Sequence, residues 1–209
     1  SDYFRHIFEL HRDLPVTQKY QIAAFDLVRG IVRLRDEKGI PIVGFDLAGE
    51  EFGRPALDHI KAFEFAAKHQ LARTVHAGEA DGAHSIYDAV HGLKANRIGH
   101  GTHLFQDTDL LNYLSDKQIP LEVCLSSNLQ TKSVSSLESH PIKDYFKQDI
   151  LITINTDSYL ISGTTLTKEF ELAIKHYQFG KKEIEQLVLN SFQAAFLPNE
   201  EKADLIRNV

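Results

Sequence analysis

The sequence of 209 residues contains one cysteine, Cys124, and this scarcity excludes several kinds of protein. A single cysteine cannot form an intramolecular disulfide, and it cannot build a zinc site made of several cysteines. Cys124 lies within an apolar stretch, which indicates a buried and unreactive thiol. Because disulfides are rare in reducing compartments, the low cysteine content favours a cytoplasmic protein.

The sequence also lacks long apolar runs and a surplus of positive charge. No uninterrupted apolar run approaches the ~18 residues of a transmembrane helix, and the first residues do not have the basic-then-apolar layout of a signal peptide. The formal net charge is −6, so we expect neither a general nucleic-acid binder nor a membrane-surface binder. The remaining composition, 43% hydrophobic and 25% charged, is ordinary for a globular protein.

Short apolar runs alternate with stretches of helical periodicity along the chain. The apolar runs predict six strands, at residues 4–10, 40–47, 73–76, 97–100, 120–124 and 150–155. The periodic stretches predict helices at residues 16–37, 54–69, 85–93, 107–116 and 141–147, and a helical region from 164 onward with breaks near 180 and 198. This alternation predicts an α/β fold with a parallel sheet, and the nearly continuous apolar strands predict a sheet buried on both faces.

Barrels and doubly wound sheets place their active sites at the carboxyl ends of the strands. About six strand–helix units are predicted, whereas a (β/α)8 barrel needs eight units and about 250 residues. If the fold is such a barrel, two units are missing, and we expect the shortage at the N-terminal side. No internal repeat, low-complexity segment or linker divides the sequence, so residues 1–209 are expected to form a single domain.

The sequence TVHAGE at residues 74–79 brings a histidine and a glutamate to the end of a predicted strand. His76 could bind a metal, and Glu79 could move protons in a metal-assisted hydrolysis. Gly78, between them, lets the backbone approach closely. His76 could alternatively be a hydrogen-bonded core histidine, and Glu79 a carboxylate facing the N-terminus of a helix.

Two further strands end in polar side chains. RIGHG at residues 97–101 places His100 between glycines, which leave room for a ligand, while His103 is expected to be a surface loop residue. ITINTD at residues 152–157 ends in Asp157, and a carboxylate after a buried strand needs a metal, a histidine or backbone amides as partners. Alternatively, Asp157 could be a helix cap or an Asx-turn residue.

Two more blocks carry residues that could support a site. DLAGEE at residues 46–51 includes Gly49, which offers an unobstructed backbone N–H to a ligand but could equally be a turn glycine. SSN at residues 126–128 contains serines, but the glycine spacing of a nucleophile elbow does not surround them. We interpret this segment as a loop that supports the site.

Taken together, these blocks resemble the adenosine deaminase family of metal-dependent hydrolases. They occur in the order of that family and cover the chain from about Ile42 to its end, with weaker similarity before it. The blocks are DLAGE at 46–50, HAGE at 76–79, RIGHG at 97–101, EVC at 122–124 with SN at 127–128, HP at 140–141 and NTD at 155–157.

The resemblance implies a (β/α)8 TIM-type barrel that holds one zinc ion. By this resemblance His76 and Asp157 are zinc ligands, Glu79 is the proton donor to the purine ring, and His100 orients and helps activate the attacking water. Gly49 is implied as a backbone donor to the purine. The implied reaction is attack of water at C6 of adenosine, which releases ammonia and gives inosine, so the expected partner is a small purine nucleoside.

The chain departs from the family pattern in two ways. The family carries a His-x-His pair on its first strand, and the sequence contains no such pair. In addition, many members have two consecutive aspartates where this chain has Asp157 followed by Ser158. The second aspartate contacts the purine, so Ser158 takes a substrate-binding position without a charge, which leaves the base preference open.

These departures support three hypotheses. The first is that the chain is the C-terminal portion of an adenosine deaminase, inactive by itself because two zinc ligands are missing. The second is a non-catalytic or assembly-dependent fragment that self-associates through the open edges of the barrel. The third is a related deaminase that acts on adenine, AMP or a modified purine.

Overall fold

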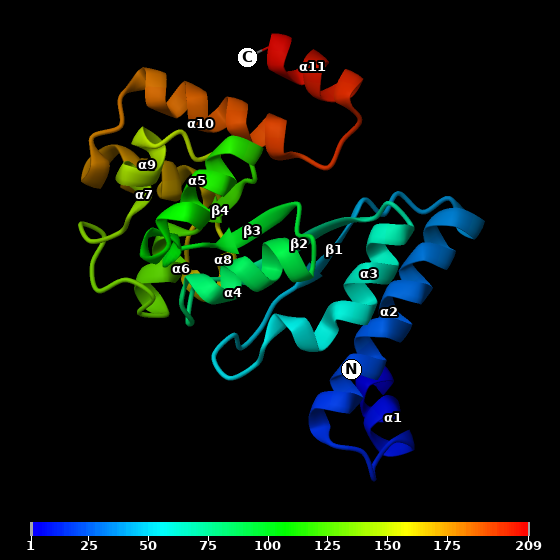
Figure 1. Ribbon diagram of the computed structural model, residues 1–209. Helices are drawn as coiled ribbons and strands as arrows, with labels where there is room; N and C mark the ends of the chain where they lie inside the picture. Colours follow the sequence, from blue (N-terminus) through cyan, green and yellow to red (C-terminus); the bar gives the residue numbers. More distant parts are fainter. Residues whose placement is uncertain (1, 209) are drawn as a thin grey trace.

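Five parallel strands form one sheet within the part of the chain that the computed structural model describes, residues 2–208 apart from the side chains of residues 3 and 4. They are β1 (Gly44–Leu47), β2 (Ala72–Ala77), β3 (Arg97–His100), β4 (Leu121–Val123) and β5 (Ile152–Ile154). Each strand pairs with the next one along the chain (Figure 1). This order is that of consecutive units in a barrel wall, so the predicted α/β fold of barrel type is confirmed.

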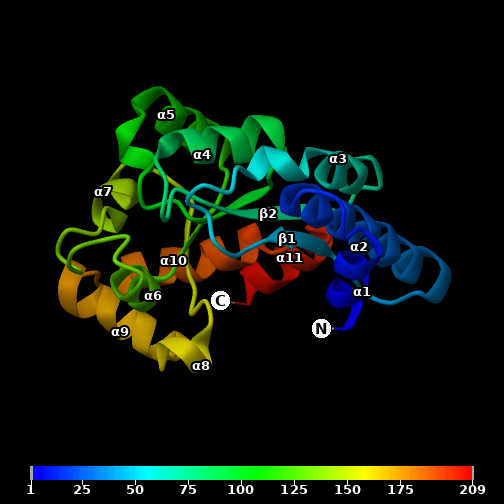
Figure 2. The same cartoon turned by 90° about the horizontal axis from the view of Figure 1, so that it is seen from below.

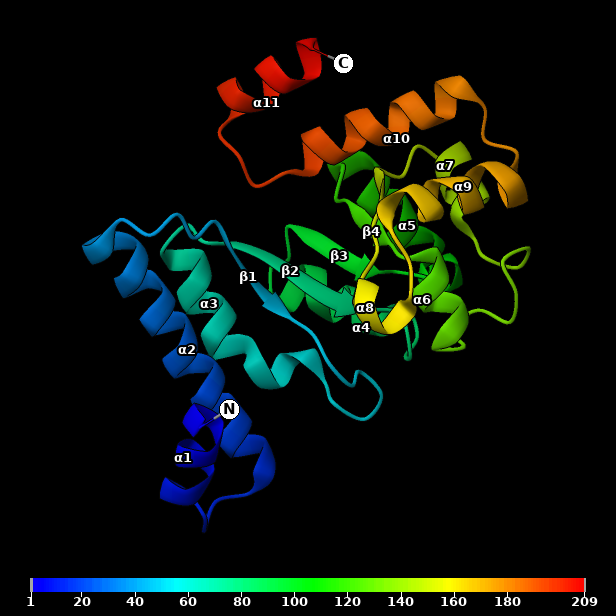
Figure 3. The ribbon, with the colours of Figure 1, turned by 180° about the vertical axis from the view of Figure 1, so that it is seen from behind.

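Helices connect and flank these strands. They are α1 (Asp2–Leu10), α2 (Val16–Lys38), α3 (Ile60–Lys68), α4 (Ala83–Tyr87), α5 (Thr108–Lys117), α6 (Leu125–Gln130), α7 (Ile142–Lys147), α8 (Tyr159–Ser162), α9 (Leu166–Tyr177), α10 (Lys181–Ala194) and α11 (Asn199–Arg207). Figure 2 shows α3, α4 and α5 on one side of the strands and α10 and α11 on the other. Figure 3 shows α1 and α11 at separate ends of the molecule. None of the helices within residues 2–208 is long and apolar enough to cross a membrane.

The prediction of a strand at residues 4–10 is wrong, because these residues belong to helix α1. Ile7 is buried, and the ring of Phe8 packs edge-on against Tyr20 of α2 with centroids 5.2 Å apart. A short apolar run fits a strand or one face of a helix equally well, and here the contact with α2 selects the helix. The chain therefore has five described strands rather than six, three fewer than a closed barrel.

The remaining elements follow the prediction with local differences. Strand β3 has the predicted bounds, whereas the predicted strand at 40–47 pairs only from Gly44 onward. The predicted helix at 85–93 is divided into α4 and a π-helical turn, Asp88–Gly92. Helices α6 and α8 follow β4 and β5 closely and were not predicted, because each is six residues or fewer and lacks a full helical period of apolar positions.

The two faces of the sheet differ in polarity. One face carries a row of fully buried apolar side chains aligned across four strands by their pairing: Val75, Ile98, Leu121 and Ile152. The next register row on the other face contains His76, Gly99, Glu122 and Thr153. The sequence predicted a sheet buried on both faces. The face with Val75 is fully buried and apolar, whereas the inner face is polar, and His76 and Glu122 on it are only half-buried.

Polar side chains on this inner face contact one another across neighbouring strands. Arg97 Nε lies 2.7 Å from Glu122 Oε1, and Thr74 Oγ1 donates to Glu122 Oε2 at 2.7 Å. The ring of Phe196 lies 3.5 Å from the Arg97 guanidinium carbon, and it comes within 3.0 Å of the position that a Cβ on Gly44 would occupy. The segment after α10 thus contacts the inner face of β1 and β3, opposite the end where the candidate site lies.

Candidate active site

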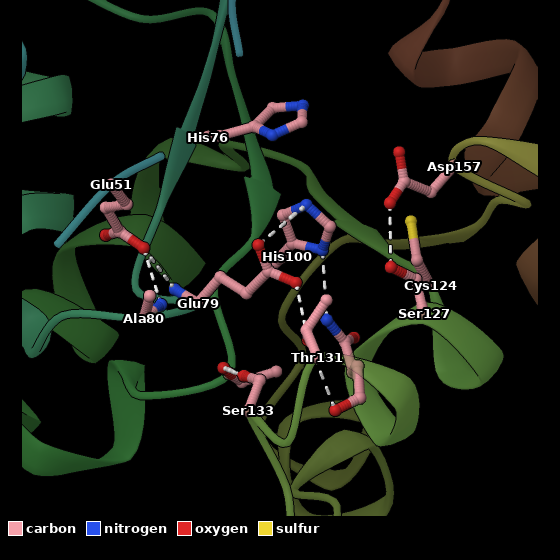
Figure 4. A network of polar contacts seen from close by, with 12 residues as sticks. Glu51, His76, Glu79, Ala80, His100, Cys124, Ser127, Thr131, Ser133 and Asp157 are labelled. Carbon is pink, nitrogen blue, oxygen red and sulfur yellow. Dashed lines mark hydrogen bonds and ion pairs between the residues drawn. The ribbon is translucent and has the colours of Figure 1, made fainter. Parts of the chain in front are cut away.

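The candidate site lies where β2, β3 and β5 end on the polar face of the sheet. His76 on β2 and His100 at the end of β3 are neighbours, with ring centroids 4.7 Å apart and planes at 85°. Asp157 follows β5, and its side chain lies on the same side as both histidines (Figure 4). The three residues line one cavity of about 500 Å³ together with Cys124. Consecutive parallel strands therefore collect residues that are 81 positions apart in the chain, from 76 to 157.

Gly99 makes the close approach of the two histidines feasible. A Cβ at this position would lie 2.7 Å from His76 Cδ2 and 3.3 Å from His76 Cα. Any side chain at 99 would therefore force the His76 ring to move. The glycine beside His100 leaves room for a neighbouring side chain rather than for a ligand alone.

His100 is buried and faces Glu79. Its Nε2 lies 3.6 Å from Glu79 Oε2, and only 2% of the residue is exposed. Burial lowers the pKa of the His100 ring, and the charge of Glu79 opposes this effect. The backbone of His100 is left-handed, with φ of 66°, a region that few non-glycine residues occupy. A neutral imidazole beside a carboxylate can position a water next to the group that transfers protons.

The Glu79 side chain points toward His100 and away from the following helix. Thr131 Oγ1 donates to Glu79 Oε1 at 2.9 Å, which leaves Oε2 on the His100 side. Helix α4 begins only at Ala83, so Glu79 is not a carboxylate in its first turn. The alternative of a residue facing the helix dipole is therefore not supported by the geometry.

Glu51 holds the turn that carries Glu79. Its carboxylate accepts hydrogen bonds from the backbone N–H groups of Gly78 at 2.6 Å, Glu79 at 2.9 Å and Ala80 at 2.6 Å (Figure 4). Ser85 Oγ donates to the same carboxylate at 2.5 Å. Sequence reasoning placed Glu51 in a block of interest but gave it no role, because its partners lie 27 to 34 positions later in the chain.

His103 also supports this turn, which corrects the expectation of a surface loop residue. It is half-buried, and both its backbone N–H and its ring Nδ1 approach the carbonyl oxygen of Gly78, at 3.0 Å and 2.9 Å. Thr102 Oγ1 donates to the same oxygen at 2.6 Å. The Gly78 turn is thus held by Glu51 on its N–H side and by the 102–103 segment on its carbonyl side.

Helix α6 and Thr131, which caps its C-terminus, contact three of the candidate residues. Ser127 Oγ donates to Asp157 Oδ2 at 2.7 Å, Asn128 lies against the His100 ring, and Thr131 binds Glu79. The sequence SSN was expected to be a supporting loop, whereas it forms the first turn of this helix. Its supporting role agrees with the expectation, and Thr131 is an addition for which the sequence had no signal.

Asp157 is an exposed residue with a left-handed backbone, φ 54°. The N-cap of α8 is Ser158 rather than Asp157, so the alternative of a capping aspartate does not hold. Within residues 2–208, six other non-glycine residues with positive φ follow helices, whereas His100 ends strand β3 and Asp157 follows strand β5. Such conformations cost on the order of 1 kcal/mol each and cluster at functional sites.

The structure separates the two expected substrate-binding residues. Gly49, with φ of 125°, lines a second cavity of about 450 Å³ that also includes His76 and Glu51. A Cβ at Gly49 would meet open space, so only its backbone conformation favours glycine. Ser158 is exposed at the start of α8 and does not line either of these cavities.

The described residues offer part of a metal site. His76 supplies a nitrogen donor and Asp157 a carboxylate, both of which suit zinc. Within residues 2–208, however, no group of three or more His, Cys, Asp or Glu side chains is arranged to hold a metal ion. Cys124 does not add a ligand, because it is 5% exposed and burial raises the pKa of its thiol. A catalytic zinc needs three protein ligands, so the donor set fits as one portion of such a site.

Comparison with known proteins gives a consistent result. The sequence model of the family described as "Adenosine deaminase" matches residues 14–209. The adenosine deaminase of Clostridium kluyveri is 40% identical over 163 residues, which cover 78% of this chain and 47% of that protein. The chain spans about half the length of the curated relatives it matches.

Two solved structures show the same architecture. The crystal structure of an adenine deaminase from Arthrobacter aurescens superposes with a TM-score of 0.83 at 29% identity, covering 90% of this chain and 56% of that one. The crystal structure of an Arabidopsis N6-mAMP deaminase superposes with a TM-score of 0.79 at 28% identity, covering 88% of this chain and 54% of that one.

Proposed function

The chain belongs to the adenosine deaminase family, and we propose that its residues form the proton-transferring part of a zinc-dependent active site that hydrolyses adenosine to inosine and ammonia. The observation that carries this proposal is the contact between Glu79 Oε2 and His100 Nε2, 3.6 Å apart at the ends of neighbouring strands. His76 and Asp157 line the same cavity as His100, which supports a role for them as zinc ligands close to Glu79 and His100.

Glu79 is the proton carrier in this proposal. When the oxygen of a water molecule bonds to C6 of the purine, one proton must reach the ring nitrogen N1. A second proton must reach the amino group before the C6–N bond breaks and ammonia leaves. A carboxylate within hydrogen-bond reach of both atoms can carry these protons in turn. Glu79 is suited to this task because Thr131 and the Glu51-bound turn hold it in place.

His76 and Asp157 would hold the zinc ion together with ligands that the described residues do not supply. When bound, zinc lowers the pKa of a water molecule and so provides a nucleophile near neutral pH. Members of this family are metal-dependent. Ser127, which donates to Asp157 Oδ2 at 2.7 Å, would orient the carboxylate as ligand-supporting residues commonly do.

The cavities suit a small purine. Their volumes of about 450 and 500 Å³ lie within the range for small-molecule sites. Gly49 would contact the base from β1, and Ser158 would take the position next to Asp157 without a charge. Similarity to an adenine deaminase and to an N6-mAMP deaminase supports adenine or a modified AMP as alternative substrates.

The test is an assay of the protein in its full natural length with zinc, against adenosine, adenine, AMP and N6-methyl-AMP. We expect adenosine to give the highest kcat/KM. Glu79→Gln should reduce the rate by a factor on the order of 10²–10⁴ because the proton carrier is lost, whereas the exposed Glu200→Gln in α11 should leave it unchanged. A higher kcat/KM for another purine would mean that adenosine is not the preferred substrate. A fully active Glu79→Gln enzyme would refute the mechanism.

The 209-residue chain by itself should show negligible deamination, even with excess zinc, because it offers two ligands where three are needed.

The second candidate function is assembly with another copy or chain, and it rests on the two outermost strands of the described sheet. Within the described sheet, β1 and β5 each pair with one neighbour. Sedimentation that shows a stable monomer would count against assembly. A cytoplasmic location remains our expectation, which cell fractionation can test.

A further inference from the structure

We propose that His140 and Asn128 together determine which ring nitrogen of His100 carries the proton, and that this nitrogen is Nε2, the one that faces Glu79. The three side chains form one hydrogen-bonded row between α7, α6 and the end of β3. All three are buried, with exposed fractions of 4%, 0% and 2% for His140, Asn128 and His100. Because these side chains are almost completely buried, the polar hydrogens that link them must meet acceptors in the protein.

The row starts at a group whose role as a donor is certain. The backbone N–H of Ile142 points at His140 Nδ1 at 3.1 Å. A backbone amide nitrogen can only donate, so His140 Nδ1 must be the unprotonated nitrogen of the ring. Burial lowers the pKa of His140 to about 4, so at neutral pH the ring carries one proton. That proton must be on Nε2.

The same reasoning then orients the Asn128 amide. His140 Nε2 lies 3.3 Å from Asn128 Oδ1, and an N–H donor requires an oxygen at that position. The reversed amide would place its NH2 group against the N–H of His140, two donors facing each other. The NH2 group of Asn128 must therefore face the other way, toward His100.

The last step assigns His100. Asn128 Nδ2 lies 3.0 Å from His100 Nδ1, so this nitrogen accepts a hydrogen bond and carries no proton. A neutral His100 ring then carries its proton on Nε2, 3.6 Å from Glu79 Oε2. Asn128 and His140 are positioning residues, because neither one lies beside Glu79 or Asp157 in the row. They act on the site only through His100.

The functional consequence rests on the proposed function. A neutral His100 with a proton on Nε2 presents a donor to the cavity, so it can hold the oxygen of an attacking water but cannot take a proton from it. Removal of that proton then falls to the Glu79 carboxylate. The row thus assigns the two roles: His100 holds the attacking water, and Glu79 takes its proton. The reason is that only Nε2 of His100 faces the cavity.

The experiment is a long-range ¹H–¹⁵N correlation spectrum of the histidine rings in the full 209-residue chain at pH 8, where ordinary imidazoles are neutral. The nitrogen shifts distinguish a protonated from an unprotonated ring nitrogen, and His100→Gln identifies the His100 signals by their loss. We expect Nε2 protonated and Nδ1 unprotonated. A proton on Nδ1, or averaged shifts from both forms, would overturn the proposal.

Three variants test the cause. Asn128→Asp replaces the NH2 donor by an acceptor of the same shape, so a proton should appear on His100 Nδ1. His140→Gln keeps a donor for Asn128 and should retain the native form, whereas His140→Ala frees the amide to rotate and should give both forms. If Asn128→Asp does not fold, the pair of His140 variants decides. If Nδ1 of His100 stays unprotonated in Asn128→Asp, Asn128 does not determine the position of the proton. If the His140→Ala spectrum is that of the native chain, His140 does not determine it.

Leu129→Ala is the matched control, because Leu129 lies in the same helix α6 and is partly exposed. It should leave the His100 ring signals as they are, and a change equal to that of Asn128→Asp would mean that any disturbance of α6 suffices, against the proposal. The spectra need neither zinc nor a purine. Failure to deaminate adenosine would therefore refute the proposed function and leave the assignment of the proton unaffected.

Discussion

Replacing Glu51 by glutamine should loosen the turn that positions Glu79. The native carboxylate accepts four hydrogen bonds, from the N–H groups of residues 78, 79 and 80 and from Ser85 Oγ, at 2.5 to 2.9 Å. Glutamine offers one oxygen and one NH2 group in their place. The NH2 group then takes the place of one carboxylate oxygen and faces the hydrogen-bond donors that this oxygen had accepted from. The negative charge that strengthened all four bonds is also lost.

The magnitude follows from the number of bonds that glutamine cannot accept. A hydrogen bond to a charged group contributes about 1.5–3 kcal/mol, and an unpaired buried donor costs about 1–3 kcal/mol. Two bonds lost from a carboxylate that is only half-buried correspond to a decrease of about 2–4 kcal/mol in the free energy of unfolding. The loss should be concentrated in the turn, so amide hydrogen exchange at residues 78–80 should accelerate most.

The assay is urea unfolding followed by circular dichroism, combined with amide exchange at residues 78–80. The control is Glu50→Gln, since Glu50 is adjacent, 73% exposed in its side chain, and pairs only loosely with Arg54 at 3.5 Å. Loss of an exposed pair of this kind should change the free energy of unfolding by less than about 0.5 kcal/mol. Equal unfolding midpoints and equal exchange rates for the two variants would refute the role assigned to Glu51.

Three other outcomes follow from the same contacts. Tyr145→Phe removes a buried hydroxyl that shares its one proton between two carbonyl oxygens and accepts a backbone N–H, so the free energy of unfolding should fall by about 1–3 kcal/mol, measured against Tyr113→Phe at a more exposed position. Gly99→Ala, whose Cβ would lie 2.7 Å from a histidine ring, should destabilise by about 1–3 kcal/mol, whereas Gly30→Ala in α2, with open space around it, should stabilise by about 0.5–1 kcal/mol; equal effects would contradict the packing argument. Burial lowers the pKa of His140 to about 4 in the folded chain, so between pH 6.5 and pH 4 the unfolded chain binds more protons. The free energy of unfolding should therefore decrease by up to about 3 kcal/mol as the pH is lowered through this range. Urea unfolding over this range checks the slope, which His140→Gln should reduce; an unchanged slope would show that other groups are responsible.

Much of the candidate site could be predicted from the sequence because its residues end strands. The motifs at His76, Glu79, His100 and Asp157 follow apolar runs, and parallel strands in consecutive order bring their ends together. The supporting residues were harder to find, since a hydrogen bond to a partner far along the chain leaves no local pattern. Thr131 is such a case, because it binds Glu79 across 52 positions.

Residues 4–10, predicted as a strand but helical in the structure, show what local sequence could not decide. Their apolar side chains fit two kinds of element, and only the packing of Phe8 on Tyr20 distinguishes them. The polarity of the inner face of the sheet was also hidden, because residues such as Arg97 and Glu122 interrupt the apolar runs singly. Their pairing at 2.7 Å depends on the register of neighbouring strands, which no single strand specifies.

The sequence by itself determined the class of fold, the family resemblance and the strand-end residues, because hydrophobic periodicity and short motifs are local properties of the chain. The tertiary structure decided which side chains hold those residues in place and how they are protonated. Glu51 acquires its role from three amides of another loop, and the His100 proton depends on a row that begins at a backbone N–H in α7. The physical reason is that a hydrogen bond depends on donors and acceptors meeting within about 3 Å, a condition that only the folded chain sets.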